Sequence, residues 1–545
     1  MTASKKRGAD ALIQSLQQAG VKRIFTLSGN HIMPLFDAAF EAGIELIHTR
    51  HEAATVHMAD AYARITGEPG IALVTGGPGH ANAVSALYTA QMAESAVVLL
   101  SGHAPNNQLG MGAFQEMRQA EMAAPVTKRS WASASANALA SDMARAISIA
   151  RSGRPGPVHL SLPTDALESD TGAGNVAIVA AAFQPVLTPL ASGEASSFIS
   201  KLLRAKRPLI LTGPASLTRF RRDQLAALEA ATGIPVVGME SPRGIGDPSL
   251  GAFAQVLALC DCVLLLGKRL DFTLKFGAVA AFAADCEFLQ IDAEKHEIER
   301  SRRAVAARLV ATAEADTTSA IEALIAASSS AVKPGRAWRD DVHAAIEYRP
   351  DAWNQAASTV TDRLHPVQAL RPLQALLDSH PDSVFISDGG EIGQWAQACL
   401  NAPHRVINGV AGAIGAALPF ALGARVAVPA APIIAVMGDG TFGFHAAEMD
   451  TAVRYGLPFL AVVGNDARWN AEYQIQLRDY GRDRLIGCEL LPARYDQVTS
   501  AFGGHGEYVT SADALMPAAQ RALASGKPSC VNVMIEGLAA PNIRR

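Results

Sequence analysis

Two short apolar runs, residues 432–437 and 459–463, constrain the fold of this chain more than any other feature. Each has the length and the composition of a buried strand. Between them, residues 444–455 repeat apolar and small side chains at helical spacing. A strand, a crossover helix and a second strand make the unit from which parallel sheets are built. The stretch therefore predicts an α/β fold with a parallel sheet.

Polar residues follow both apolar runs. Gly438 and Gly440 allow a tight turn around Asp439, with Thr441 available to start a helix, and Asp466 follows the second run. Ligands bind at the carboxyl ends of parallel strands, so the two aspartates can converge on one hard cation. Oxygen ligands of this kind suit Mg2+. The alternative is an ordinary strand–helix–strand unit with polar loop ends.

The pattern Gly-Asp-Gly, followed about 27 residues later by Asn-Asp, resembles the cofactor motif of thiamine diphosphate enzymes. The resemblance implies that Asp439, Asp466 and the backbone carbonyl of Arg468 hold the metal that grips the diphosphate. The chain departs from the family at Asp466, where asparagine is usual. This departure adds a negative charge to the predicted metal site.

The first third of the chain predicts a second parallel sheet, because four apolar strands alternate with helices there (residues 21–27, 44–48, 71–75 and 96–100). His31, Glu52 and His80 lie at strand-to-helix junctions on one edge of this sheet. Each histidine can be a proton shuttle or a hydrogen-bond donor to a carbonyl. Each can equally be a helix-start residue without a chemical role.

Three segments of this region, RHEAA, GGPGHANAV and AFQEM, resemble the amino-terminal domain of the acetolactate synthase and benzaldehyde lyase group. The resemblance implies that Glu52 hydrogen-bonds N1′ of the aminopyrimidine ring and favours the tautomer that removes the thiazolium C2 proton. It also implies that Gln115 points at the substrate, and it favours a role for His31. Without the resemblance, Glu52 would be a helix-start acid favoured by the macrodipole and Gln115 a solvated loop residue.

The middle of the chain predicts a further α/β unit, and its loop GKRLDFTLKFG resembles the oxalyl-CoA decarboxylase and 2-hydroxyacyl-CoA lyase branch. The family uses this domain for FAD, for ADP or for neither. No complete dinucleotide glycine fingerprint is present, so FAD or ADP is an option without sequence support, and an empty structural domain is the alternative.

Residues 410–424 are rich in Gly and Ala and predict a closely packed helix. By alignment to the pair Leu418-Pro419, Ile414 falls where the family places a bulky apolar residue under the bent cofactor. The alternative for Ile414 is a plain core position.

Composition excludes several classes of function. A chain of 545 residues needs two to four domains, and its net charge of −4 gives no electrostatic case for nucleic acid or an anionic membrane. The six cysteines show no Cys-x-x-Cys pair, and Cys260 and Cys262 stand in an apolar run, which indicates reduced core thiols. No signal peptide and no apolar segment of membrane length are seen, so we expect a cytoplasmic protein.

The resemblance covers the whole chain and implies three consecutive α/β domains with parallel sheets. We expect a pyrimidine-binding domain at residues 1–185, a central domain at 190–335 and a diphosphate-binding domain at 360–545. The implied cofactors are thiamine diphosphate and Mg2+. Because the family places the cofactor between the first domain of one subunit and the third of another, a homodimer or homotetramer is expected.

The expected function is a lyase or carboligase that breaks or forms a C–C bond next to a carbonyl, with 2-hydroxyacyl-CoA lyase-like or benzaldehyde lyase-like chemistry. A decarboxylating carboligase of the acetolactate synthase type is the alternative, and a non-catalytic paralogue is another. The expected partner is a small molecule: a 2-oxo acid, a 2-hydroxy ketone or an acyl-CoA.

Overall fold

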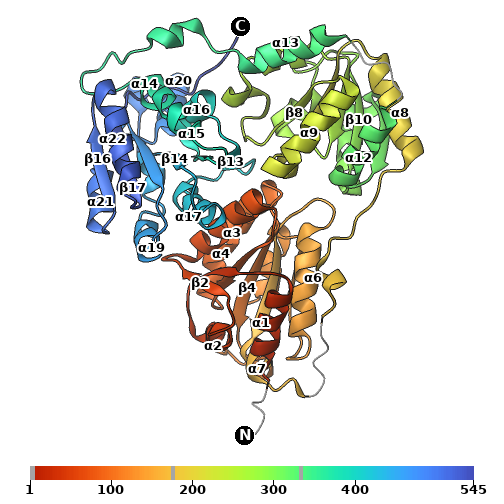
Figure 1. The fold of residues 1–545 in the computed structure, drawn as a ribbon, viewed down its shortest axis with the longest axis vertical. Helices are drawn as coiled ribbons and strands as arrows, with labels where there is room; N and C mark the ends of the chain where they lie inside the picture. Colours follow the sequence, from red (N-terminus) through yellow and green to blue (C-terminus); the bar gives the residue numbers. More distant parts are fainter. Residues whose placement is uncertain (1–5, 173–177, 330–334) are drawn as a thin grey trace. The chain divides into compact units, whose positions relative to one another are not determined.

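The computed structural model describes residues 6–172, 178–329 and 335–545, whose strands form three sheets (Figure 1). Every pairing between named strands is parallel. The predicted class of three α/β domains is therefore confirmed. The domain limits stay a prediction, and the segment considered for a signal peptide includes residues 1–5, which lie outside the described part.

The described residues fall into two compact units. The first contains those up to residue 186 together with residues 418–429 and 445–457, and the second contains the rest. The short segments 418–429 and 445–457 thus pack with the amino-terminal third although they are distant from it in sequence.

The first unit is built on a six-stranded sheet in the order β2-β1-β3-β4-β6-β5. Its strands are β1 (Arg23–Thr26), β2 (Glu45–His48), β3 (Gly70–Val74), β4 (Val97–His103), β5 (Arg129–Ala132) and β6 (Val158–Pro163). Helices α1 (Gly8–Gln18) and α6 (Leu139–Arg151) share one apolar core with the sheet. The other α-helices of the amino-terminal third are α2 (Met33–Ala39), α3 (Glu52–Thr66), α4 (Pro78–Met92), α5 (Gln119–Ala123) and α7 (Thr164–Glu168).

Small residues bring helix α3 unusually close to its neighbours. A Cβ at Gly70 of β3 would stand 2.0 Å from the carbonyl oxygen of Ala59 in α3, and a Cβ at Gly423 of α17 (Ala417–Ala427) would stand 2.3 Å from that of Met58. The Gly- and Ala-rich composition therefore lets α3 pack against both a strand and a helix. This packing fixes the helix whose first residue is Glu52.

The second unit contains two sheets. The central one has the order β11-β10-β9-β7-β8, and the third has the order β13-β12-β14-β15-β17-β16. The central strands are β7 (Pro208–Thr212), β8 (Val236–Gly238), β9 (Cys262–Leu266), β10 (Glu287–Asp292) and β11 (Leu309–Glu314), with helices α8 (Ser192–Arg204), α9 (Arg219–Thr232), α10 (Phe253–Leu257), α11 (Lys295–Val305), α12 (Thr317–Ala327) and α13 (Arg336–Glu347).

The third sheet contains β12 (Val384–Ser387), β13 (His404–Ile407), β14 (Ile433–Gly438), β15 (Leu460–Asn465), β16 (His505–Val509) and β17 (Ser529–Met534). The helices in this part of the sequence are α14 (Pro366–Leu370), α15 (Gln374–Leu377), α16 (Gly390–Cys399), α17, α18 (Asp439–Phe442), α19 (Glu448–Arg454), α20 (Asn470–Tyr480), α21 (Tyr495–Ala501) and α22 (Ala512–Ala524). Strands β14 and β15 are neighbours, as the apolar runs predicted.

Two predicted helices differ from the structure. The helix expected at 410–424 begins only at Ala417, because Gly409, Gly412 and Gly415 adopt φ of +72°, +68° and +88°, in the left-handed region that breaks a helix. Within the segment 444–455, where a helix is expected, the helix is the shorter α19 (Glu448–Arg454), and α18 (Asp439–Phe442) ends before the segment begins. Ile414 therefore lies in a loop.

Two predictions from composition meet the structure directly. All six cysteines are free thiols, and Cys260 and Cys262 are buried, which confirms that they belong to the core. Among the described residues, no helix is both long and apolar enough to cross a membrane.

Candidate functional site

The predicted metal ligands lie at the carboxyl ends of neighbouring strands. Gly438 of β14 pairs with Gly464 of β15, so Asp439 and Asp466 emerge from the same edge of the sheet. Both side chains are buried, with 2% and 7% of their surface exposed. The backbone N–H groups of Ala467 and Arg468, just after β15, interact with the Asp439 carboxylate and partly offset the effect of burial on its pKa, so the two strand ends meet at one point.

The electrostatics of these two aspartates indicate a cation. Burial raises the pKa of Asp439 to about 6, and burial together with the charge of Asp439 raises that of Asp466 to about 7. Asp439 Oδ2 is buried and has no hydrogen-bond partner among the described residues. A divalent cation would supply the missing partner and relieve the repulsion between the two carboxylates. The residues present therefore fit a metal.

The two glycines that flank Asp439 have different structural roles in the turn. Thr441 Oγ1 accepts the N–H of Gly438 and donates to its carbonyl, both at 3.1 Å, which closes the turn. A Cβ at Gly440 would stand 2.6 Å from the ring of Trp469, whereas a Cβ at Gly438 would meet no atom closer than 3.7 Å. Glycine is thus needed at position 440, because a larger residue would clash with Trp469. Position 438 has room for a side chain.

Arg468 lies next to both carboxylates. Its guanidinium lies over the ring of Tyr473, with its central carbon 4.2 Å from the ring centroid. Its positive charge offsets part of the rise in the pKa of Asp466. No cluster of three or more His, Cys, Asp or Glu side chains suited to a metal occurs in the described part of the chain. A cation here would need backbone, phosphate or water oxygens as further ligands, and the role of the Arg468 carbonyl stays a prediction.

Ile414 is presented by a loop that is held from below by Asp388. This aspartate is 1% exposed and accepts the N–H groups of Gly389, Gly415 and Ala417 at 2.7, 2.9 and 3.0 Å. Ile414 itself is 36% exposed, and its methyl group would lie 2.5 Å from a Cβ at Gly389. An apolar side chain exposed on a tightly bonded loop is suited to contact a ligand.

In the first unit, Glu52 is the first residue of α3 and is partly buried. Its Oε2 accepts a hydrogen bond from Asn82 Nδ2 at 3.0 Å, and a Cβ at Gly79 would stand 3.3 Å from its Oε1. The start of α4 therefore orients the carboxyl group. Sequence reasoning missed Asn82, although it belongs to the quoted segment GGPGHANAV.

Glu448 of α19 was also missed by sequence reasoning. This carboxylate is 1% exposed and accepts the backbone N–H groups of Arg50 and His51 at 3.0 and 3.1 Å, with the Thr451 hydroxyl donating at 2.7 Å. It fixes the turn directly before Glu52. No local signal in the sequence could have shown this, because the contact joins distant segments.

His31 and Gln115 come together through the loop between β4 and α5. The ring of His31 stacks on Phe114, with centroids 5.9 Å apart. Burial lowers the pKa of His31, and hydrogen bonds from the ring to the Phe114 backbone and to the Gln115 side chain partly offset this. Gln115 has φ of +56°. A Cβ added at Gly77 would stand 2.8 Å from the Cβ of Gln115. The predicted substrate-facing pair is thus held against the start of α4.

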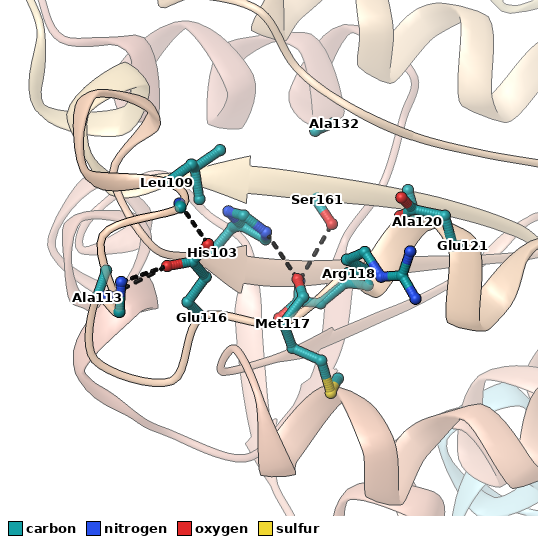
Figure 2. Close-up of a pocket in the computed structure, with 13 residues that line it drawn as sticks. His103, Leu109, Ala113, Glu116, Met117, Arg118, Ala120, Glu121, Ala132 and Ser161 are labelled. Atoms are coloured by element: carbon teal, nitrogen blue, oxygen red, sulfur yellow. Dashed lines mark hydrogen bonds between the residues drawn. The ribbon is translucent and has the colours of Figure 1, made fainter.

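The same loop borders a cavity of about 640 Å³ (Figure 2). Glu116 accepts the backbone N–H groups of Gly110, Gly112 and Ala113 at 2.6, 3.2 and 3.1 Å, and these bonds lower its pKa. His103 Nε2 lies 3.1 Å from the carbonyl oxygen of Met117 at the other side of the loop. These contacts shape the loop that carries Gln115.

His80 lies deeper than the other predicted site residues. Its side chain is 0% exposed, its Nδ1 lies 2.9 Å from Ser101 Oγ, and its ring centroid lies 4.5 Å from that of His159. Burial lowers its pKa to about 4. His80 is therefore neutral at pH 7 and packed in the interior of the first unit.

The basic loop of the central sheet is engaged with its own surroundings. Lys268 is 2% exposed, and its Nζ donates to Thr273 Oγ1 at 2.7 Å. Arg269 forms an ion pair with Glu297 at 3.2 Å. These contacts add no support for FAD or ADP.

Comparison with known proteins matches all three parts of the chain. The N-terminal TPP binding domain of thiamine pyrophosphate enzymes matches residues 6–122, the central domain matches 196–324 and the C-terminal TPP binding domain matches 388–533. The chain belongs to the thiamine pyrophosphate enzyme family. The TPP binding domains support thiamine diphosphate as the cofactor.

Similar thiamine pyrophosphate enzymes carry several names. A probable acetolactate synthase of Mycobacterium bovis is 32% identical over 540 residues, covering 96% of this chain and 95% of the relative. A 2-hydroxyacyl-CoA lyase 2 of Danio rerio is 30% identical, covering 98% and 92%. An oxalyl-CoA decarboxylase of Escherichia coli is 29% identical, covering 97% and 95%. At these identities the family is shown and the particular reaction is not.

Proposed function

We propose that this chain is a thiamine diphosphate- and Mg2+-dependent lyase or carboligase that breaks or forms a C–C bond next to a carbonyl group. The observation that carries the proposal is the buried pair Asp439 and Asp466, with their raised pKa values and the unpartnered Asp439 Oδ2. A buried pair of like charges is costly unless a cation neutralises it. A cation bound here would in turn attract a diphosphate.

When bound, thiamine diphosphate supplies a nucleophilic carbon that attacks a carbonyl and stabilises the charge left when the neighbouring C–C bond breaks. The chain's own residues then have distinct tasks. Glu52, oriented by Asn82, would hydrogen-bond the aminopyrimidine ring and hold a proton there. Ile414, exposed on its loop, would support the bent cofactor from below.

His31 and Gln115 are proposed to face the substrate carbonyl. His31 stacks on Phe114, the residue before Gln115. Burial lowers the pKa of His31, so the ring is neutral at pH 7 and offers one N–H donor. His80 would support this pair from the interior through Ser101.

Within the family, 2-hydroxyacyl-CoA lyase-like or benzaldehyde lyase-like chemistry is the leading proposal. Ile414 and the loop at residues 267–277 support it, as does the similarity to 2-hydroxyacyl-CoA lyase 2. The acetolactate synthase type is the second candidate, favoured by the 32% identity to the Mycobacterium bovis protein. The substrate would be a 2-oxo acid, a 2-hydroxy ketone or an acyl-CoA, and the active species a homodimer or homotetramer.

The test uses the purified protein saturated with thiamine diphosphate and Mg2+. It is incubated separately with pyruvate, benzoin and a 2-hydroxyacyl-CoA, and the products are identified by mass spectrometry, with Glu52→Gln as the inactive control. Release of an aldehyde from benzoin, or of a shortened aldehyde and formyl-CoA from the 2-hydroxyacyl-CoA, supports the leading proposal. Acetolactate from pyruvate favours the second candidate. No product in any arm favours a non-catalytic paralogue.

A further inference from the structure

A second cavity, of about 410 Å³, opens on the first unit, and none of the residues assigned above lines it. Its walls come from β5 at the edge of the first sheet, from helix α6 (Figure 1) and from residues 178–182, which follow the first sheet in the sequence. It shares no lining residue with the cavity beside the Gln115 loop. Its volume is within the range for small-molecule sites.

Two exposed arginines, Arg129 of β5 and Arg145 of α6, line this cavity. Among the described residues, neither guanidinium group forms an ion pair or a hydrogen bond. Because both side chains are exposed, a ligand that enters from solvent can reach their N–H groups. The cavity therefore offers two positive charges whose hydrogen-bonding capacity the protein itself does not use.

The ring of Trp131 supports both arginines. The central guanidinium carbon lies 5.8 Å from the ring centroid for Arg129 and 5.4 Å for Arg145. Trp131 is itself partly buried and packs against the apolar core that α1 and α6 share with the sheet. Contact with an aromatic ring holds a guanidinium group through its charge and leaves N–H donors free for an anion. One anchored side chain thus keeps the two arginines close to each other.

The described lining of the cavity contains no aspartate or glutamate. Asp142, one turn before Arg145 on α6, accepts the Ser133 hydroxyl at 2.8 Å and forms no ion pair with Arg145. The two serines of the lining, Ser141 and Ser148, donate to main-chain carbonyl groups at 2.9 and 2.7 Å. The positive charge of the arginines is therefore not neutralised within the cavity, which favours an anionic ligand.

Apolar side chains form the rest of the lining, namely Ala144, Ile149, Ile178 and Ala182. The segment 178–182 is tied down just after its end, because Phe183 is buried in the core of the first unit and Ser148 Oγ donates to the carbonyl oxygen of Gln184. This wall is therefore present before any ligand binds. A ligand that fits combines an anionic head with a small apolar body.

We propose that this cavity binds an organic phosphate monoester, with its phosphate between Arg129 and Arg145 and a short aliphatic body on the apolar wall. A phosphate monoester carries a charge between about −1.5 and −2 at pH 7 and three terminal oxygens, so it matches two guanidinium groups in charge and in acceptors. A carboxylate matches one of them. None of the residues proposed for cofactor binding lines this cavity, so the site is separate from that of the cofactor's diphosphate.

The test is isothermal titration calorimetry of the full chain saturated with thiamine diphosphate and Mg2+, in a buffer without phosphate. The probes are isobutyl phosphate and 3-methylbutanoate, which share an aliphatic body and differ in the head group. We expect isobutyl phosphate to bind with a Kd below about 1 mM and 3-methylbutanoate to bind at least about tenfold more weakly. Equal binding of the two probes overturns the phosphate assignment.

Arg129→Gln and Arg145→Gln should each raise the Kd of isobutyl phosphate at least about tenfold, because each removes a charge-assisted contact. Arg151→Gln is the matched control, since this arginine is also on α6 but does not line the cavity. An equal loss of affinity in Arg151→Gln would reflect net charge alone and would overturn the proposal.

A filling variant covers the case in which an arginine variant does not fold. Ala182 lines the cavity and is exposed, so Ala182→Leu fills part of the space without disturbing a core position. Loss of isobutyl phosphate binding in Ala182→Leu at an unchanged Tm supports the site. Binding that survives all three variants, or a parent protein whose Kd for isobutyl phosphate is above about 1 mM, overturns the proposal.

Discussion

The carboxylate of Glu448 accepts the backbone N–H of His51 at 3.1 Å, although 397 residues separate the two in the sequence. The bond lies one residue before Glu52, and the same carboxylate also takes the N–H of Arg50. Glu448 is therefore a positioning residue for the predicted acid, because it fixes the turn from which helix α3 starts.

Replacing Glu448 by alanine should destabilise the protein by about 1–3 kcal/mol, since two backbone N–H groups lose their acceptor. It should also slow proton exchange at C2 of the cofactor while leaving Mg2+-dependent cofactor affinity nearly unchanged. The measurements are denaturant unfolding, proton NMR after acid quench and calorimetry. Glu448→Gln, which keeps one acceptor oxygen, should recover part of both losses. Asp450→Ala on the same helix removes only partly exposed ion pairs and should change little.

Removing the carboxylate of Asp439 should abolish the grip on the cofactor. In Asp439→Ala a cation would be held by Asp466 alone, so we expect thiamine diphosphate affinity in Mg2+ to fall by more than about tenfold. Titration calorimetry with and without Mg2+ measures this, with the exposed Asp483→Ala as control. Asp466→Asn, which introduces the residue usual in the family, should retain binding. Undiminished affinity in Asp439→Ala would rule out the assigned metal site.

Glu52→Gln keeps the size of the side chain and a hydrogen-bonding group but removes the carboxyl. Exchange of the C2 proton of bound cofactor for deuterium should slow by roughly a hundredfold if the carboxyl acts as a positioned acid and base. Cofactor affinity should be retained, because the proposed metal ligands lie in the other unit. Glu68→Gln, at an exposed position just after α3, is the control. Equal exchange in parent and Glu52→Gln would leave Glu52 as a plain helix-start acid.

The two glycines around Asp439 should respond differently to alanine. Gly440→Ala places a methyl group 2.6 Å from the Trp469 ring and should cost about 1–3 kcal/mol of unfolding free energy, with a change in tryptophan fluorescence. Gly438→Ala should be tolerated, since its φ of −80° suits any residue and its nearest neighbour is 3.7 Å away. Equal effects of the two substitutions in denaturant titrations would contradict this account of the turn.

His80 should make the folded protein less stable as the pH is lowered from about 6.5 toward 4. Its folded-state pKa of about 4 lies below the value of 6.5 expected in an unfolded chain, so the unfolded state binds the proton more readily between these values. Its contribution is full above about pH 6.5 and is lost as pH falls toward 4, on the order of 3 kcal/mol in all. The Tm advantage of the parent over His80→Gln should therefore shrink between pH 7.5 and pH 5. A Tm advantage that does not change with pH would refute the role assigned to His80. His296→Gln, at an exposed histidine, serves as the control.

The sequence by itself determined the fold class and the strand ends that carry the candidate site. Apolar runs and glycine turns are local signals, and the edge of a parallel sheet collects whatever follows its strands, so Asp439 and Asp466 could be named without coordinates. Glu52 was named from the resemblance of its segment to a known family. The same local reasoning failed at residues 410–416, because it predicted a helix from Gly and Ala where Gly412 and Gly415 adopt positive φ.

Only the tertiary structure decided how these residues are held and charged. The contacts of Glu448 with His51 and of Asp388 with the Ile414 loop join distant segments, and the raised pKa values of Asp439 and Asp466 follow from burial and mutual proximity. Burial and long-range contact depend on the packed chain as a whole, and no short stretch of sequence carries them.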